Sequence, residues 1–183
     1  MYLEKRLPII RELGFREEAL PQLKAFIELL TSSNEELNLI SRKMTEEELI
    51  DNHIIDCLMP ISKFPTDIKS VADFGTGGGL PAVIYAIQFP NIKFHLFEKS
   101  NLKQDFLNRC RKIAPNMEVH ADIPLRLPNV DLVIARAFKA IDIILDMSRQ
   151  YYANGGKYFL FKGRLEKIEE EIGLAKKKFK DLN

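Results

Sequence analysis

The spacing of apolar residues divides the chain into two parts. Up to about residue 62, apolar residues recur every three or four positions, as in "LPQLKAFIELL" at 20–30, and this spacing is typical of amphipathic helices. A helix is also predicted over 45–60, because Thr45 and Glu48 match the capping-box pattern and Pro60 ends the run. From residue 69 onward, short apolar runs alternate with helical stretches. The predicted strands are "SVADF", "IKFHLF", "MEVH", "DLVIA" and "KYFLF", and the predicted helices cover 80–89, 100–113, 139–151 and 164–181.

Strands that alternate with helices of this length indicate βαβ units and a mainly parallel sheet. The run "DLVIA" at 131–135 has almost no polar alternation, as expected of a central strand that is buried on both faces. We therefore predict an α/β, Rossmann-like fold, in which a mainly parallel sheet is flanked by helices. The change of pattern at 63–68 separates an N-terminal helical cap, residues 1–62, from an α/β core, residues 63–183, and the two are expected to form one compact unit.

The last predicted helix carries an apolar stripe with spacings of three and four residues: Leu165, Ile168, Ile172, Ala175 and Phe179. This spacing indicates that the stripe lies on the sheet. The lysines at 176–178 fall near the negative end of the helix dipole, where cations are favoured. A helix that binds a partner through the same stripe is the alternative interpretation.

The composition narrows the possible functions. Lys and Arg number 27 against 26 Asp and Glu, which argues against a polycation that coats nucleic acid indiscriminately but allows a local basic face. Cys57 and Cys110 lie outside any CxxC or Cys/His pattern, so neither a disulfide nor a metal site is predicted. The first residues contain no apolar run long enough for a signal peptide or a membrane span. We expect a cytoplasmic monomer without membrane contact.

The stretch "DFGTGGGLP" contains four of the nine glycines. Glycines after a strand allow a sharp turn and let backbone N–H groups approach a ligand, and a helix is predicted to follow, with Pro81 in its first turn. The dinucleotide fingerprint requires a glycine at its sixth position, where this chain has Leu80. The pattern Asp73-x-Gly75-x-Gly77-x-Gly79 instead favours a ligand with a cationic amino-acid end, because Asp73 attracts an ammonium or sulfonium and repels a pyrophosphate. The alternative is a glycine-rich turn in which Asp73 only caps local N–H groups.

Glu98 supports a nucleoside ligand. It ends the second predicted strand, and a carboxylate at the tip of the second strand of a βαβ unit is placed to hold a ribose diol. NAD and S-adenosylmethionine both carry that ribose, so Glu98 does not separate them, whereas the glycine spacing and Asp73 favour S-adenosylmethionine. A solvated strand end is the alternative reading of Glu98 alone.

Several stretches together carry a family resemblance. "DFGTGGGLP", "NLIS" at 38–41, "HIIDC" at 53–57, "DLVIARAF" at 131–138 and "FKG" at 161–163 occur in the order and spacing of the bacterial ribosomal small-subunit RNA methyltransferase G family, also called glucose-inhibited division protein B. The sequence resembles that family over roughly residues 20–163. The resemblance implies transfer of a methyl group from S-adenosylmethionine to N7 of a guanosine in 16S ribosomal RNA, either free or in a small-subunit precursor. Guanine N7 has a free lone pair, so the reaction needs positioning and electrostatics but no general base.

The resemblance also implies roles for individual residues. Gly75 and Leu80 would line the methionine side of the cofactor, Glu98 the ribose, and Ala121 and Asp122 the adenine. Together with the glycine-loop pattern, the predicted cofactor-binding residues are Asp73, Gly75, Gly77, Gly79, Leu80, Glu98, Ala121, Asp122 and Arg136.

Arg136 would face the reaction centre and the RNA, where a guanidinium can bind guanine O6 or a flanking phosphate. A structural ion pair of Arg136 with Asp131 or Asp142 is the alternative. The resemblance places His53 close to the pocket, while His95 and His120 receive no role. The predicted RNA-binding residues, besides Arg136, are Arg42, Lys43, Lys139, Lys162 and Arg164.

The sequence departs from the family at three places. The second strand is followed by Glu98-Lys99 instead of Asp-Ser, and the third by His120-Ala121-Asp122 instead of an Arg-x-Glu pattern. The chain ends at "KKKFKDLN", so the C-terminal edge of the sheet is expected to be missing, which leaves the fifth strand as an open edge. A non-catalytic cofactor- or RNA-binding module is the main alternative function, and a NAD-dependent oxidoreductase is a weaker one.

Overall fold

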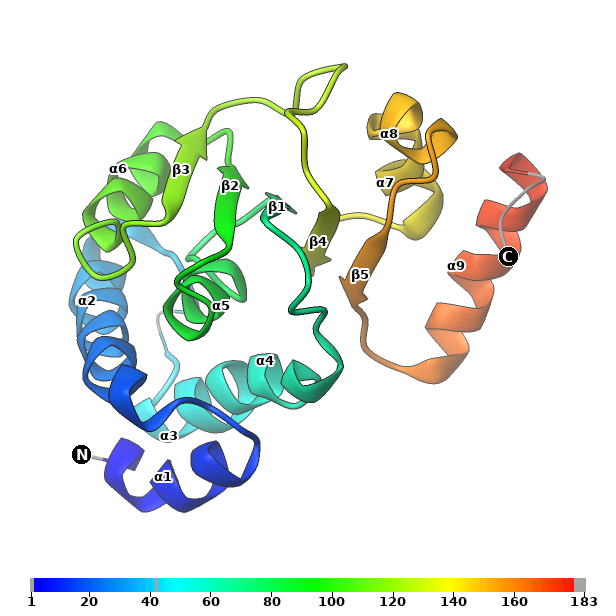
Figure 1. The fold of residues 1–183 in the computed structure, drawn as a ribbon. Coiled ribbons are helices and arrows are strands. Elements are labelled where there is room, and N and C mark those ends of the chain that lie inside the picture. Colours follow the sequence, from blue (N-terminus) through cyan, green and yellow to red (C-terminus); the bar gives the residue numbers. More distant parts are fainter. Residues whose placement is uncertain (1, 42, 180–183) are drawn as a thin grey trace.

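The computed structural model describes residues 2–41 and 43–179, and its centre is a parallel sheet of five strands (Figure 1). The strands are β1 (Ser70–Phe74), β2 (Lys93–Phe97), β3 (Met117–His120), β4 (Leu132–Arg136) and β5 (Tyr158–Phe161), in the order β3-β2-β1-β4-β5. Each of the five apolar runs forms a strand, which confirms the predicted Rossmann-like α/β fold.

The order in which the strands are added to the sheet reverses at β1, in the centre. From β1 the chain runs outward through β2 to β3, and it then returns to place β4 against the other side of β1. Asp73 of β1 is therefore in register with Leu96 of β2 and with Ile134 of β4. A crevice opens outside the carboxyl ends of parallel strands where the strand order reverses, and this topology places it after β1 and β4.

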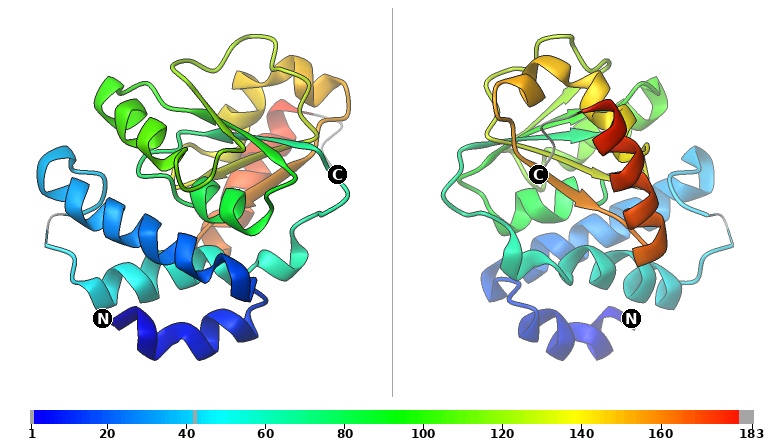
Figure 2. Two further views of the ribbon diagram at one scale, coloured as in Figure 1. Left: turned by 60° about the vertical axis from the view of Figure 1, so that its left-hand side comes forward. Right: turned by 90° about the vertical axis from the view of Figure 1, so that its right-hand side faces the viewer.

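Helices cover both faces of the sheet (Figure 2). On one face lie α5 (Ala82–Gln88) and α6 (Asn101–Cys110), together with the N-terminal helices. On the other face lie α7 (Ile141–Met147), α8 (Arg149–Ala153) and α9 (Leu165–Lys178). The central strands are buried from both sides, and Val71, Ala72 and Phe74 of β1 have no exposed surface.

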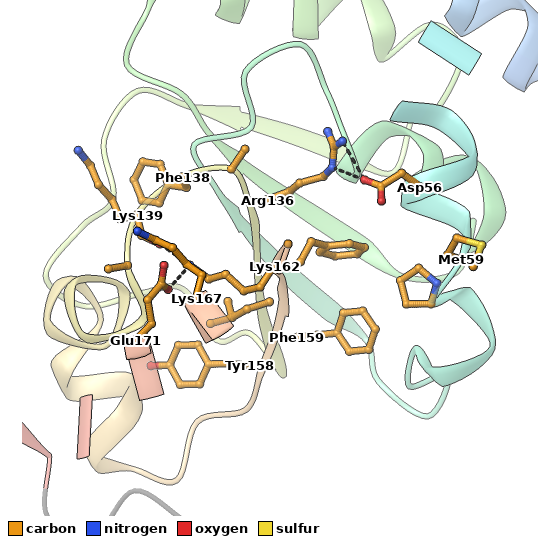
Figure 3. A pocket seen from close by; sticks show the side chains of 16 residues that line it. Asp56, Met59, Arg136, Phe138, Lys139, Tyr158, Phe159, Lys162, Lys167 and Glu171 are labelled. Carbon is orange, nitrogen blue, oxygen red and sulfur yellow. Dashed lines mark hydrogen bonds and ion pairs between the residues drawn. The ribbon is translucent and has the colours of Figure 1, made fainter. Parts of the chain in front are cut away.

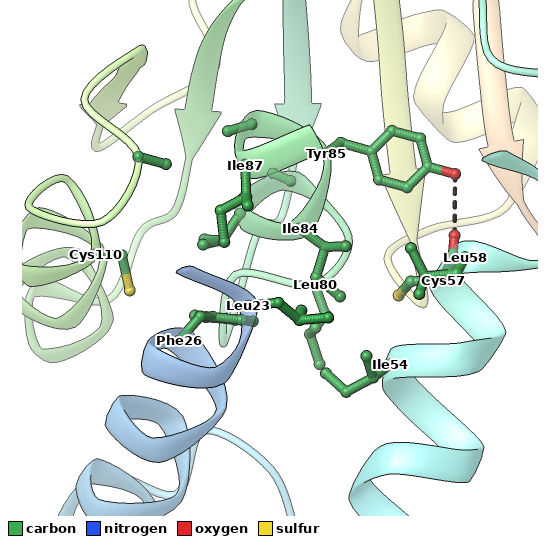
Figure 4. Packing of buried hydrophobic residues seen from close by; sticks show 14 of the residues in the cluster. Leu23, Phe26, Ile54, Cys57, Leu58, Leu80, Ile84, Tyr85, Ile87 and Cys110 are labelled. Carbon is green, nitrogen blue, oxygen red and sulfur yellow. Dashed lines mark hydrogen bonds between the residues drawn. The ribbon is translucent and has the colours of Figure 1, made fainter. Parts of the chain in front are cut away.

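The N-terminal helices form a cap on α5. They are α1 (Tyr2–Glu12), α2 (Leu20–Leu37), α3 (Glu46–Leu49) and α4 (Asp56–Leu58), and a π-helical segment, Ile50–Ile55, joins the last two. The predicted capping box is present, because the Glu48 amide donates to Thr45 Oγ1 and the Thr45 amide donates to Glu48 Oε2. Figure 4 shows Leu23 and Phe26 of α2 and Ile54 of the π-helical segment packed around α5. Cap and core thus share one hydrophobic cluster.

Several predicted helices have different bounds in the structure. The helix predicted over 139–151 is broken into α7 and α8 at Ser148, whose hydroxyl donates to the Ile144 carbonyl at 2.8 Å and lies 2.8 Å from the Tyr158 hydroxyl. Side-chain bonding of this kind competes with the helix backbone. The helix predicted over 80–89 begins later, at Ala82, so Pro81 is its N-cap residue and does not lie in the first turn.

The predicted apolar stripe of α9 is wrong at two positions. Leu165 and Ile172 are exposed, whereas Glu171, which is not part of the predicted stripe, is buried with Ala175 and Phe179. Glu171 is buried because Lys162 and the Ile141 amide both bind its Oε2, at 2.7 and 3.1 Å. The ion pair with Lys162 therefore helps to decide which face of α9 is buried, and the apolar spacing of the helix does not reveal this pair.

The edge of the sheet beyond β4 is formed by β5. Among the described residues β5 pairs with β4 alone, so its other edge carries no strand within that part of the chain. This arrangement agrees with the predicted open edge. A membrane-spanning helix is not found: within 2–41 and 43–179, every helix is too short or too polar to cross a bilayer.

Tyr85 connects the core to the cap and provides a test of this packing. Its hydroxyl, on a fully buried side chain of α5, donates to the Cys57 carbonyl at 3.0 Å (Figure 4). We expect Tyr85→Phe to lower the free energy of unfolding by about 1–2 kcal/mol in urea titrations, because the ring is kept and a buried hydrogen bond is lost. Tyr152→Phe is the control, since its hydroxyl has no hydrogen-bond partner in the described part of the chain. An equal change in both variants would contradict a specific link between cap and core.

Candidate active site

A cavity of about 650 Å³ opens at the carboxyl ends of β1, β2 and β4, where the topology predicts a crevice. Seven of the predicted cofactor-binding residues line it: Gly75, Gly77, Leu80, Glu98, Ala121, Asp122 and Arg136. The cap closes one side with Leu39, Ile40 and His53. A cavity of this size is typical of a small-molecule site.

The glycine loop after β1 is held by the end of β2. The amides of Gly75 and Thr76 both donate to the Phe97 carbonyl, at 2.9 and 3.2 Å. Gly75 has a φ of +70°, and the ring of Phe138 occupies the space that a β-carbon would need. Gly77 has a φ of +59°, which directs its amide to Glu98 Oε2 at 2.9 Å. The glycines thus serve backbone conformation and close packing around the cavity.

Glu98 stands between the glycine loop and the start of α6. Its second oxygen, Oε1, accepts from the Ser100 amide at 2.9 Å. A carboxylate oxygen has two lone pairs, so each oxygen of Glu98 retains the capacity to accept one more hydrogen bond. Glu98 is half-buried and lines the cavity, which suits it to two neighbouring hydroxyl groups.

Asp73 does not line the cavity, although it is close to the glycine loop. It is 1% exposed, and neither carboxylate oxygen has a hydrogen-bond partner among the described residues. The alternative in which Asp73 only caps local N–H groups is therefore wrong. Burial raises the pKa of Asp73 to about 7, although the nearby Thr76 hydroxyl lowers it, and the charge of Glu98 makes a smaller raising contribution. Within residues 2–41 and 43–179, no cation compensates this buried acid.

Of the remaining predicted cofactor-binding residues, Ala121 and Asp122 line the cavity and Gly79 does not. Ala121 and Asp122 follow β3, are exposed, and line the far end of the cavity. The Asp122 carboxylate lies 4.0 Å from the Lys99 ammonium. Gly79 is not at the cavity wall, and its φ of +87° and its contact with Val83 serve the turn into α5.

Arg136, at the end of β4, binds the cap. Its guanidinium donates to Asp56 Oδ2 at 2.9 Å from Nη2 and at 3.2 Å from Nε, and Nη2 also lies 3.2 Å from His53 Nδ1. Burial and the Arg136 charge lower the pKa of His53, so its neutral ring can accept that hydrogen bond. The predicted alternative partners are wrong: Asp131 instead accepts from the amides of Lys69 and Ser70, and no ion pair of Asp142 is found among the described residues.

A second cavity, of about 1070 Å³, lies beside the first between β4, β5 and α9 (Figure 3). The two cavities share Arg136, Phe138 and Lys139, and Lys139 is exposed between them. Asp56 and Met59 of the cap line the second cavity alone. A ligand bound in the second cavity and a ligand bound in the first would therefore both lie next to Arg136.

The predicted RNA-binding residues are dispersed. Lys139 and Lys162 line the second cavity, but the Lys162 ammonium is bound to Glu171 and to the Lys139 carbonyl, both at 2.7 Å. Lys43 and Arg164 are exposed and line neither cavity. Arg42 lies outside the described residues.

The family model for rRNA small subunit methyltransferase G matches residues 19–182 of the chain. The chain belongs to this family. One relative, ribosomal RNA small subunit methyltransferase G 1 of Bdellovibrio bacteriovorus, is 68% identical over 181 residues, which cover 99% of this chain and 88% of that protein. The methyltransferase G of Pelagibacter ubique is 32% identical, over 91% of this chain and 83% of that protein. The family predicted from the sequence is thus confirmed.

Solved structures agree on the fold. A precorrin-6y C5,15-methyltransferase of Geobacter metallireducens superposes with a TM-score of 0.54 at 16% identity, over 77% of this chain and 76% of that chain. A putative O-methyltransferase of Klebsiella pneumoniae gives a TM-score of 0.52 at 11% identity, over 86% of this chain and 78% of that chain. At such low identities the likeness shows only that this chain shares their fold.

Sequence reasoning missed two residues of this site. Asp56, within "HIIDC", is the ion-pair partner of Arg136, although the two are 80 residues apart in the chain. Phe138 packs over Gly75. In the sequence, Asp56 and Phe138 appear only as parts of two separate motifs. The motifs themselves were the available signal, because the family pattern includes both "HIIDC" and "ARAF".

The burial of Asp73 predicts a pH dependence of stability. Its pKa lies at about 7 in the folded protein and near 3.8 when unfolded, so between these values the folded state holds a proton that the unfolded state has lost. The free energy of unfolding should therefore fall as the pH rises from about 4 to about 7. In Asp73→Asn this loss should be absent. The free energy of unfolding of the variant, measured by urea unfolding relative to wild type, should therefore be roughly 2–4 kcal/mol higher at pH 8 than at pH 4.

The exposed Asp67 provides the control for this experiment. Asp67→Asn should keep the pH profile of the wild-type protein. Parallel profiles of wild type and Asp73→Asn would show that Asp73 is not the buried acid that shapes the profile.

Proposed function

We propose that this protein transfers a methyl group from S-adenosylmethionine to N7 of a guanosine in small-subunit ribosomal RNA. One feature supports this most: a cavity at the end of β1 that combines a pinned glycine loop with a diol acceptor in Glu98. The buried, unpaired Asp73 precedes this loop in β1. Membership of the methyltransferase G family supports the reaction and the RNA class. The N7 position follows from the family resemblance of the sequence.

The charges around the cavity fit a cationic nucleoside. Asp73, Glu98 and Asp122 lie in or next to its walls, and a sulfonium with an ammonium group would offset the negative charge that Asp73 carries when ionised. A pyrophosphate would instead face the carboxyl groups of Glu98 and Asp122, which disfavours a dinucleotide. Gly75, Gly77 and Leu80 would hold the methionine end, Glu98 the ribose hydroxyls, and Ala121 and Asp122 the adenine.

The protein's part in the reaction is to position the groups. When bound, S-adenosylmethionine supplies a methyl group on a positively charged sulfur. Guanine N7 carries no proton, so the residues around Arg136 need only orient the base and shield the site from water. Asp56 and His53 hold the Arg136 guanidinium at the border of the two cavities. There it can donate to guanine O6 or to a flanking phosphate while N7 stays open to the methyl group.

The second cavity would receive the RNA. It adjoins the first at Arg136, and Lys139 stands exposed at the common rim, where a phosphate would gain from its charge. Met59, which is 63% exposed on the cap side, offers an apolar surface to a base. Lys162 would act indirectly, since its ion pair with Glu171 holds the segment that carries Lys139.

Binding of the cofactor can be tested by calorimetry. We expect Glu98→Gln to weaken S-adenosylmethionine binding at least about tenfold, because the variant loses a charged acceptor and loosens its bond to the Gly77 amide. Glu166→Gln, on the exposed side of α9, should bind like wild type. NADH should not bind to either protein. Tight NADH binding without S-adenosylmethionine binding would favour an oxidoreductase instead.

The role of Arg136 can be tested by tritium transfer to small ribosomal subunits that lack the methyl group. We expect Arg136→Lys to reduce the rate about 10²-fold, since the fork of hydrogen bonds to Asp56 and to the base is lost. The affinity for S-adenosylmethionine should change much less. Arg126→Lys, on an exposed loop away from both cavities, is the matched control. Firm cofactor binding with no transfer even by wild type would point to a non-catalytic module.

A further inference from the structure

Two histidines and a glutamate gather on one face of β2 and β3, apart from the residues assigned to the reaction. His95 of β2 is in register with Glu118 of β3, and His120 follows Glu118 by two residues, so all three side chains point to the same side of the sheet. They lie on the face opposite α5 and α6, since their neighbours Phe94, Leu96 and Val119 pack on the other side.

The donor atoms of these residues converge. His95 Nδ1 lies 3.0 Å from His120 Nε2, and the Glu118 carboxylate lies 3.9 Å from the first nitrogen and 3.8 Å from the second. Donor atoms that share one zinc ion at ~2.0–2.2 Å are themselves roughly 3 to 4 Å apart. The three groups therefore surround a point that each could reach with little movement.

The rings are held in place by packing. His95 is 7% exposed, and His120 is stacked on Phe97 with 4.9 Å between ring centroids and 21° between planes. Because the strands fix both backbones, the imidazoles cannot separate freely.

We propose that His95, Glu118 and His120 form a binding site for a divalent transition metal ion of the zinc class, with water in the remaining position. Two imidazoles and one carboxylate suit zinc and related ions, whereas Mg²⁺ and Ca²⁺ prefer oxygen donors. Lys93, whose ammonium lies 2.7 Å from Glu118, competes with the ion. Its side chain is 55% exposed, so the ion pair breaks at little cost.

A bound ion would connect to the cofactor cavity through the backbone. The His120 carbonyl accepts from the Glu98 amide, and Phe97, on which His120 stacks, accepts from the glycine loop. The ion would cross-link β2 to the edge strand β3 just below Glu98. It would thus raise the thermal stability of the sheet edge without entering the cavity.

The site can be tested with tag-free protein titrated with Zn²⁺ against a chromophoric chelator, and with Co²⁺ followed by its visible d–d absorption. We expect one ion per chain, no competition from Mg²⁺, and a rise in Tm with Zn²⁺. His120→Gln and Glu118→Gln should each weaken Zn²⁺ binding at least about tenfold. Lys93→Met should strengthen it, because Glu118 loses its competing cation.

The third histidine of the chain provides the control. His53→Gln, in the cap, should leave Zn²⁺ affinity unchanged. The proposal is overturned if wild type binds Zn²⁺ no better than folded His120→Gln and Glu118→Gln, or if His53→Gln alone removes the binding. The circular dichroism spectrum of each variant establishes that it is folded.

Discussion

The hydrogen bonds between the glycine loop and the end of β2 are the constraint on which the site depends. The Phe97 carbonyl accepts hydrogen bonds from two amides of the loop, and the Glu98 carboxylate accepts a third from the Gly77 amide. These bonds direct the loop around the end of the sheet and leave a cavity above it. They require left-handed backbone at Gly75 and Gly77, which other residues adopt only with strain. The same carboxylate that would hold a ribose is thus part of the scaffold that forms the cavity.

The cap is coupled to the candidate active site by charge as well as by packing. The buried cluster around α5 fixes the position of the cap, and the Arg136–Asp56 ion pair then joins the cap to the end of β4. The Arg136 side chain is only 16% exposed, so its orientation is set by Asp56 and His53 and not by solvent. A substrate that bound Arg136 would therefore compete with, or share, a contact that also holds the cap.

Contacts with α9 hold the part of the site that borders the second cavity. The Lys162–Glu171 pair is nearly buried, with side chains 17% and 10% exposed, and Lys162 also binds the Lys139 carbonyl. This network fastens α9 and the end of β5 to the segment that borders both cavities. Among the described residues β5 pairs with β4 alone, and α9 and this ion pair fix the end of β5 in place.

The sequence by itself determined the elements and the chemistry of the loop. Apolar runs bounded by glycine and proline specify the strands, because local patterning and sheet burial agree there. The stretch "DFGTGGGLP" and Glu98 predict a nucleoside site. Only the tertiary structure decided which distant charges meet. Arg136 binds Asp56 and not Asp131 or Asp142, Glu171 turns inward to Lys162, and His95 faces His120 across two strands. Such contacts depend on strand register and helix docking, which bring together residues that no local pattern relates.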